Sequence, residues 1–465
     1  MNAILLRPTD VLFFRDGRPM SGSLAGHTAA WPLPDVTNHA LHAALHRAGL
    51  DGVHSHRRGR SGEYSEQRDR KFGSVVSAGP FPVDEHGRWF FPRPKDAQQK
   101  SSVELTFKPV RSMKKDGDES PWAGSSLPKP LEYAVASTRP PDKEAGEEPW
   151  LSSDAFTEYL RQHRLQPGTD HFLRDESIAD REANLGIGID PDTQTTGQET
   201  AAGKIYTAHY LRLRDGFQMG LIAAAEDKEY QHPEHGRDLL RSLLNGNPTR
   251  IVVGGQQRIC TATLQSCAGN GLPMPRGLTT AADFTVLSNG RIALKWILLS
   301  PAIFPEIPAT KKDGSPQNPH PGGWLPNWVD ARTGKVLLTS GAGIRKSQRK
   351  PRVAAGGTIA ARLVAALVPK PIPVTGWALP NDTDRPQGGA KSTHLAVPAG
   401  AVYYFEADSP QEASKLAAAL NWHGDTPGTQ IKNRRSTLLG EKGFGLGVCG
   451  TWNFYENNAG KQPRP

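Results

Sequence analysis

Histidines are the residues of this chain whose spacing first suggests acid–base or metal chemistry. His39, His42 and His46 recur at helical spacing and share one face. No carboxylate or thiol nearby completes a ligand set, so we expect a solvated helix face and no metal site. His27 could act as a general base only with a second group in reach. The chain lacks the motifs G-x-x-x-x-G-K-S/T, H-E-x-x-H and G-x-S-x-G, and we predict neither an enzyme nor a cofactor.

Positive charge is concentrated in three segments with loop-like composition. The 465 residues include 56 Lys plus Arg and 47 Asp plus Glu, a net charge of +9. The basic segments are 57–71, 108–115 and 345–352. Each could neutralise several phosphates, which gives salt-dependent affinity without sequence preference. The alternative is a charged loop with no partner, but three such segments in one chain favour a nucleic-acid partner.

A glycine-rich run near the C-terminus could hold phosphate groups on its backbone. The basic, aromatic and glycine residues of this run are Arg434, Arg435, Lys442, Gly443, Phe444, Gly445 and Gly447. Glycines let backbone N–H groups approach a phosphate without interference from a Cβ atom. The basic side chains would add charge, and Phe444 could offer a stacking face. The same run could instead be a glycine-rich turn that enters a strand.

The elements that must position these residues fall into two similar series. In the first series we expect strands at 4–14, 205–213, 217–224 and 251–264 and helices at about 35–48 and 236–244. In the second series we expect strands at 284–299, 372–378, 401–406 and 444–452 and helices at about 359–367 and 410–420. Pro8 predicts an edge or bulged first strand, and Asp215-Gly216 predicts a hairpin turn. The capping box at Ser409–Glu412 opens the last helix.

This order of elements predicts an α+β fold with two tandem ferredoxin-like (βαββαβ) domains, at 1–272 and 273–465. A long insertion at about 51–203, with one helix at 154–163, belongs to the first domain, and the glycine-rich loop ends the second. No run of about 18 apolar residues occurs, so we expect no membrane partner. The 3 cysteines cannot form a disulfide framework, which fits a cytoplasmic location.

Several blocks along the chain occur together in one known family. They are residues 6–22 (LRPTDVLFFRDGRPMSG), 31–45, 175–213, 253–258 (VGGQQR), 298–326, 397–406 (VPAGAVYYFE) and the glycine-rich C-terminus. Together these blocks resemble the third subunit of the Cmr complex, the type III-B CRISPR effector whose subunits belong to the RAMP superfamily. Gln256 departs from the family pattern, because an acid is usual at this position.

The resemblance implies a non-catalytic RNA-binding subunit of this antiviral effector. Such a subunit caps one end of the complex and holds the 5′ handle of the CRISPR RNA. The implied partners are the CRISPR RNA, the large polymerase-like subunit and the neighbouring RAMP backbone subunit. The positions that match family motifs, whose role in RNA binding is our inference, are Arg15, Arg18, His27, Arg181, Asn184 and the run from Arg435 to Gly447.

Two other functions remain open on the residues alone. A RAMP endoribonuclease that matures CRISPR RNA would use His27 as its general base, although no Tyr or Lys in the same segment forms an evident partner set. A scaffold subunit would use its basic loops to meet acidic surfaces of other subunits.

Overall fold

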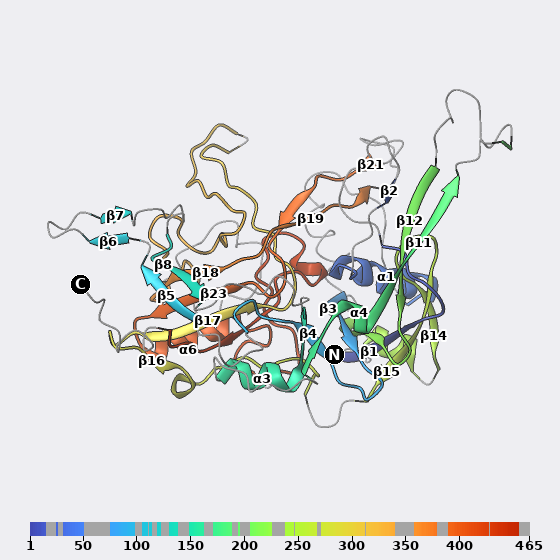
Figure 1. Ribbon diagram of the computed structural model, residues 1–465, viewed down its shortest axis with the longest axis horizontal. Coiled ribbons are helices and arrows are strands. Elements are labelled where there is room, and N and C mark those ends of the chain that lie inside the picture. Colours follow the sequence, from blue (N-terminus) through green and yellow to red (C-terminus); the bar gives the residue numbers. More distant parts are fainter. Residues whose placement is uncertain are drawn as a thin grey trace, which may run out of the picture. The chain divides into compact units, whose positions relative to one another are not determined.

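The computed structural model describes residues 1–14, 25–26, 31–50, 75–97, 105–109, 111–113, 119–121, 130–137, 148–161, 171–187, 194–195, 205–225, 238–245, 247–266, 271–311, 313–339, 358–378, 389–426 and 428–454 (Figure 1). Within these ranges the fold is a mixture of α and β structure that is rich in sheet and has few helices. The chain forms two compact units. Unit 1 comprises Met1–Arg88, Asp175–Ser266 and Ile372–Leu395, and unit 2 comprises Trp89–Arg174, Cys267–Pro371 and Ala396–Pro465.

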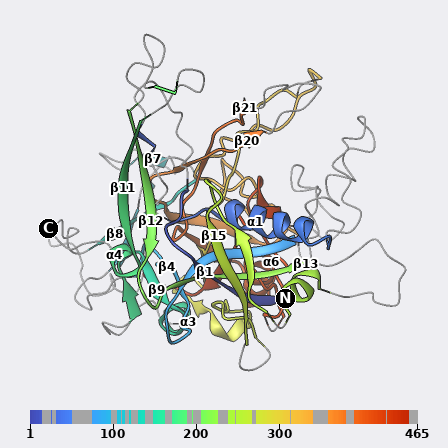
Figure 2. The ribbon, with the colours of Figure 1, turned by 90° about the vertical axis from the view of Figure 1, so that its right-hand side faces the viewer.

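The main sheet of unit 1 has five strands in the order β14-β15-β1-β13-β3. Their bounds are β1 Asn2–Pro8, β3 Val75–Val83, β13 Gln218–Ala225, β14 Thr249–Val252 and β15 Ile259–Gln265. All neighbouring strands are antiparallel. Helix α1 (Pro34–Arg47) packs against β3 and β14, and α5 (Leu239–Leu244) packs against β13 and β15. Figure 2 shows α1 on one face of this sheet. The core between helices and sheet includes Ile4, Leu41 and Leu240.

A second sheet of unit 1 contains a long two-stranded arm (Figure 1). Strand β11 (Ala179–Ile187) follows the short helix α4 (Asp175–Ile178) and pairs with β12 (Ile205–Leu213) along its whole length. Strand β2 (Ala25–Gly26) adds to the other side of β12 in parallel orientation. Two short pairs complete the strands of unit 1. They are β19 (Ile372–Val374) with β22 (His394–Ala396), and β20 (Trp377–Ala378) with β21 (Gly389–Ala390).

The main sheet of unit 2 also has five strands. Its order is β16-β17-β23-β18, and β24 pairs with β17. The bounds are β16 Thr285–Val286, β17 Ile292–Leu298, β18 Ala361–Leu367, β23 Val402–Ala407 and β24 Gly447–Gly450. Helix α6 (Pro410–Leu420) packs on β17, β23 and β24. Its predicted cap is confirmed, because the N–H of Glu412 donates to Ser409 Oγ over 3.2 Å.

The remaining elements of unit 2 come mostly from the segment before residue 175. A three-stranded sheet has the order β10-β9-β4, and helix α3 follows β9 directly. The bounds are β4 Phe90–Pro92, β9 Trp150–Ser152, β10 Phe172–Leu173, α3 Ser153–Arg161, β5 Leu105–Pro109, β6 Arg111–Met113, β7 Glu119–Pro121, β8 Tyr133–Ser137, and the 3-10 turns η2 Ala281–Asp283 and η4 Gly440–Lys442. Strand β5 pairs with β8, and β6 pairs with β7.

Three predictions about the strands of unit 1 are wrong in their pairing. Strand β1 is central rather than at an edge, because Pro8 is its last residue. Strands β12 and β13 have nearly the predicted bounds, but they do not pair as a hairpin. Strand β12 belongs to the sheet with β11 and β2, whereas β13 belongs to the main sheet. The predicted kinked strand at 251–264 is two antiparallel strands, β14 and β15.

Two further expectations differ from the structure. The helix expected at 359–367 is strand β18, whose apolar side chains fit a buried position beside β23. The region 51–203 was expected to be an insertion of loops, but its apolar run VVSAGPFPV forms β3 of the main sheet of unit 1. Another part of it, Trp89–Arg174, belongs to unit 2. The expected helix at 154–163 is α3.

None of the helices in the described ranges combines the length and apolar composition that crossing a membrane requires.

Candidate nucleic-acid interface

Strand β12 brings together the segments of unit 1 that the sequence predicted to bind RNA. Asn184 of β11 and Gly26 of β2 both lie opposite Ala208, on either side of β12. Nearer the base of the arm, Leu211 lies opposite Arg181 and also forms a bridge with Leu12. Gly26 and Asn184, which are 158 residues apart in sequence, therefore share one sheet.

The other predicted residues of this region lie outside the described residues. They are Arg15, Arg18 and His27. The described residues that flank them in sequence lie beside β12, because Leu12 bridges Leu211 and Ala25 pairs with Thr207. The basic segments 57–71 and 345–352 likewise lie wholly outside the described ranges, as do Lys114 and Lys115.

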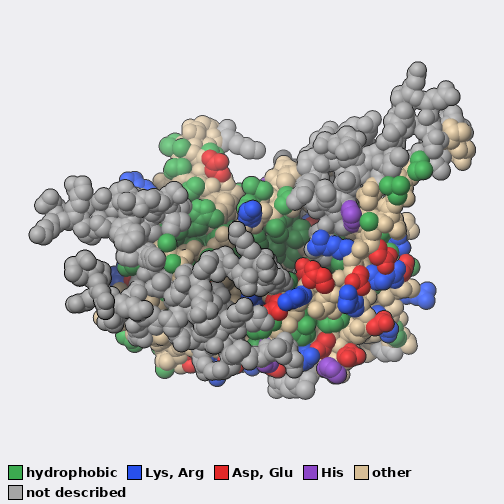
Figure 3. Space-filling view, in the orientation of Figure 1, with side chains coloured by type: hydrophobic (Ala, Val, Ile, Leu, Met, Phe, Trp, Pro, Cys, Tyr) green, Lys and Arg blue, Asp and Glu red, His purple; other side chains and the backbone are tan. Residues whose placement is uncertain are grey.

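Strand β11 presents polar and apolar side chains to solvent. Arg181 and Asn184 are exposed. Leu185 and Ile187 are 71% and 55% exposed, which is unusual for large apolar side chains. Figure 3 shows charged side chains over the lower part of the arm and apolar side chains toward its upper end. This combination suits a single-stranded nucleic acid, whose phosphates need positive charge and whose unstacked bases need apolar surface.

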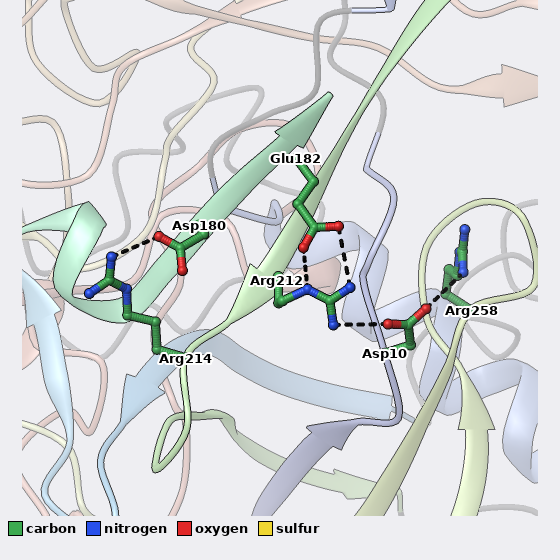
Figure 4. Close-up of polar contacts among 6 residues, drawn as sticks. All are labelled: Asp10, Asp180, Glu182, Arg212, Arg214 and Arg258. Atoms are coloured by element: carbon green, nitrogen blue, oxygen red, sulfur yellow. Dashed lines mark hydrogen bonds and ion pairs between the residues drawn. The ribbon is translucent and has the colours of Figure 1, made fainter. Parts of the chain in front are cut away.

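An ionic network fixes the base of the arm (Figure 4). Arg212 Nη1 donates to Asp10 Oδ1 over 3.0 Å, and Arg212 also donates two hydrogen bonds to the carboxylate of Glu182. Asp10 Oδ2 lies 3.6 Å from Arg258 Nη1. The pKa of Arg212 is raised mainly because its guanidinium donates hydrogen bonds to Glu182. Because these side chains are partly exposed, the network orients its members more than it stabilises the fold.

A second ion pair lies beside this network. Arg214 Nη2 donates to Asp180 Oδ1 over 2.8 Å, and this hydrogen bond raises the pKa of Arg214. Arg212, Arg214 and Arg258 thus each have a carboxylate partner at the base of the arm. Arg181 lies between Asp180 and Glu182 on β11, and it is exposed on the opposite face of the strand.

The turn between β14 and β15 adds an aromatic and arginine cluster that the sequence prediction did not assign to RNA. Tyr210 of β12 donates its hydroxyl to Gln256 Oε1 over 2.9 Å. The guanidinium of Arg258 lies over the Tyr210 ring, 5.0 Å from its centroid. The centroid of the Phe13 ring is 5.5 Å from the centroid of the same Tyr210 ring. The sequence feature that marks this cluster is the block 253–258. Tyr210 lies outside that block, because it is 46 residues from Gln256.

The glycine-rich run of unit 2 has its backbone donors already engaged. The N–H of Lys442 donates to Leu439 O over 2.9 Å, that of Gly443 to Gly440 O over 3.1 Å, and that of Gly445 to Pro301 O over 2.7 Å. Phe444 is fully buried. The expected stacking role of Phe444 is therefore wrong for this conformation, because its ring has no exposed face, and the amides of the run cannot also cradle a phosphate.

The basic residues of this run are also buried or partly buried in unit 2. Arg435 is 1% exposed and donates from Nε to Ala419 O over 2.6 Å, and burial lowers its pKa to about 10. Burial also lowers the pKa of the Arg434 guanidinium, and Lys442 is buried. A Cβ atom on Gly445 would lie 2.0 Å from the backbone N of Ser436, so close packing explains that glycine.

Comparison with known proteins defines the class. Residues 4–452 match the model of a family of CRISPR-associated proteins. This chain belongs to that family, which is described as CRISPR-associated protein (Cas_Cmr3). The resemblance seen in the sequence blocks is thereby confirmed. No curated protein sequence matches the chain.

Several solved structures show a weak likeness to this fold. Type III-B Cmr-beta bound to cognate target RNA includes a chain with 13% identity and a TM-score of 0.39, with 86% of each chain covered. The same complex bound to cognate target RNA and AMPPnP gives 12% identity, a TM-score of 0.38 and 86% coverage of each chain. The Csm3–Csm4 subcomplex of the type III-A interference complex gives 9% identity and a TM-score of 0.32, covering 87% of this chain and 92% of the other.

Proposed function

We propose that this chain is a non-catalytic RNA-binding subunit of a type III-B CRISPR effector and holds the 5′ handle of the CRISPR RNA. In this proposal it also contacts the large polymerase-like subunit and a RAMP backbone subunit. The family membership supports the effector role. The observation that carries the RNA role is the sheet β11-β12-β2, which puts Asn184 and Gly26 opposite the same residue of β12.

The chemistry of that sheet supports single-stranded RNA as the ligand. Arginine binds phosphate through several donors, and asparagine can donate to and accept from a base edge. Arg181 and Asn184 supply these groups as exposed residues on opposite faces of β11. Leu185 and Ile187 add apolar surface against which unstacked bases can pack. None of these contacts requires an acid–base pair, so the function needs no catalytic residue of this chain.

We also infer that both main sheets are ferredoxin-like. In unit 1 the strands β1, β3, β13 and β15 lie in the spatial order fourth, first, third, second, which is the order of a βαββαβ unit. In unit 2 the strands β17, β18, β23 and β24 lie in the same order, and α6 precedes the fourth strand as α5 does in unit 1. Domain limits at 1–272 and 273–465 and a cytoplasmic location stay predictions.

The experiment that tests this function uses the full chain and repeat-derived RNA. Fluorescence anisotropy would compare the unmodified chain with the double variant Arg181→Ala/Asn184→Ala. We expect about tenfold weaker binding and a smaller dependence on salt, since one phosphate contact is lost. The matched control is Arg250→Ala, which removes an exposed arginine from β14 of the same unit. Equal affinity of the double variant, or cleavage of the RNA by the unmodified chain, would contradict the proposal.

A further inference from the structure

The turn between β14 and β15 holds an arginine in position to receive a base. Arg258 lies over the ring of Tyr210, a residue that is only 8% exposed and packs with Phe13. The side chain of Arg258 is 29% exposed, so part of the guanidinium reaches solvent. Guanidinium planes, like aromatic rings, are surfaces on which unstacked RNA bases stack.

Gln256 is oriented by the same cluster. Its Oε1 atom accepts from the hydroxyl of Tyr210 over 2.9 Å and from Arg258 Nη2 over 3.3 Å. Because an arginine only donates, the amide atom that faces it must be the oxygen. The amide nitrogen of this exposed side chain is thereby turned away from Arg258 and offers its two N–H donors to an acceptor.

The backbone of the turn is built to hold this arrangement. The N–H of Gly255 donates to Phe13 O over 2.8 Å, and a Cβ on Gly254 would lie 2.5 Å from that same oxygen. Gln256 and Gln257 have φ values of 54° and 51°. Left-handed backbone is unfavourable for a residue that carries a side chain, and such strained residues cluster at ligand sites.

We propose that the turn Val253–Arg258 is a subsite for one nucleotide of single-stranded RNA. The base stacks on the exposed side of the Arg258 guanidinium, and an acceptor oxygen or nitrogen of that nucleotide takes a hydrogen bond from the amide nitrogen of Gln256. Asp10 connects this subsite to β12, because its carboxylate pairs with both Arg258 and Arg212. The inference rests on the proposed function, since the RNA must reach β12 for the subsite to be filled.

The test combines protein variants with abasic RNA. Arg258→Lys keeps the positive charge beside Asp10 but removes the planar stacking surface. We expect about tenfold weaker binding of repeat-derived RNA to Arg258→Lys, and a similar loss when one particular nucleotide of the RNA is made abasic. The two losses should not add, because they remove the same contact. Arg250→Lys is the control and should bind as the unmodified chain does.

A second pair of variants tests Gln256 separately. Gln256→Glu can still accept from Tyr210 and Arg258 but offers no donor to the RNA, whereas Gln257→Glu adds the same charge one residue away. We expect Gln256→Glu to bind the RNA several-fold more weakly than Gln257→Glu does. Equal affinities of these two variants, or fully additive losses for Arg258→Lys and every abasic position, would overturn the subsite while leaving the proposed function intact. Failure of the unmodified chain to bind the RNA would overturn the proposed function and the subsite with it.

Discussion

Arg212 of β12 and Glu182 of β11 are diagonal neighbours in the sheet and are joined by two hydrogen bonds from one guanidinium to one carboxylate. Asp10 accepts a third hydrogen bond from the same guanidinium over 3.0 Å. The charge of Arg212 is therefore balanced at the base of the arm. An RNA phosphate that approached Arg212 would have to compete with two carboxylates that already occupy its donors.

This balance predicts that removing a carboxylate strengthens RNA binding. Glu182→Gln leaves Arg212 with less compensating charge, so we expect a severalfold gain in affinity for repeat-derived RNA at low salt and a steeper salt dependence. The control is Glu85→Gln, which removes an exposed carboxylate elsewhere in unit 1. Weaker binding by the Glu182→Gln variant would show instead that the pair positions the arm, and would contradict the prediction.

The glycine-rich run of unit 2 predicts a stability effect. Gly445 has φ +74° and no room for a Cβ atom, whereas Gly323 has φ +63° and nothing within 4 Å of that position. We expect Gly445→Ala to destabilise unit 2 by about 3 kcal/mol, and Gly323→Ala to cost only about 1 kcal/mol from its backbone conformation. Urea unfolding followed by tryptophan fluorescence would measure both values. Equal values would contradict the packing role assigned to Gly445.

Local features of the sequence predicted local structure well. The Ser409–Glu412 cap formed as expected, because its contacts span three residues. The role of the glycine-rich run could not be predicted, since a phosphate-binding loop and a packed turn use the same residue type. What decides between them is the carbonyl of Pro301, far away in sequence, which accepts from Gly445. The sheet that joins Asn184 to Gly26 is likewise a long-range pairing that periodicity does not encode.

A buried ion pair in unit 2 predicts a large loss of stability on mutation. Lys295 Nζ lies 3.1 Å from Asp96 Oδ2, both side chains are buried, and the hydroxyls of Tyr159 and Tyr404 also donate to Asp96. Burial lowers the pKa of Lys295, so the ammonium depends on Asp96 to stay charged. We expect Asp96→Asn to destabilise unit 2 by about 3–5 kcal/mol in urea unfolding.

Two comparisons check this interpretation of the ion pair. Asp283→Asn removes an exposed carboxylate of unit 2 and should change stability by less than about 0.5 kcal/mol. The double variant Asp96→Asn/Lys295→Met no longer buries an unpaired charge, and should be more stable than Asp96→Asn alone. If the double variant were less stable than the single one, the charge would not be the source of the loss.

His423 predicts a specific loss of stability in acid. Burial lowers its pKa to about 4, and its Nε2 atom accepts from the N–H of Gly277 over 3.1 Å. The usual pKa of about 6.5 applies in the unfolded chain, so the contribution of neutral His423 is complete above that pH and is lost as the pH falls toward 4. Between pH 7 and pH 5 we expect a loss of about 2 kcal/mol. His423→Gln should lack this part of the pH dependence, and identical pH profiles for both proteins would refute it.

The central claim is that the sheet β11-β12-β2 of unit 1 contacts the 5′ handle. The most direct measurement is photo-crosslinking of a 4-thiouridine-substituted repeat RNA in the assembled complex, followed by mass spectrometry of the adducts. We predict adducts on residues 179–187 and 205–213. Adducts confined to the glycine-rich run at 434–447, or found only on other subunits, would contradict the account.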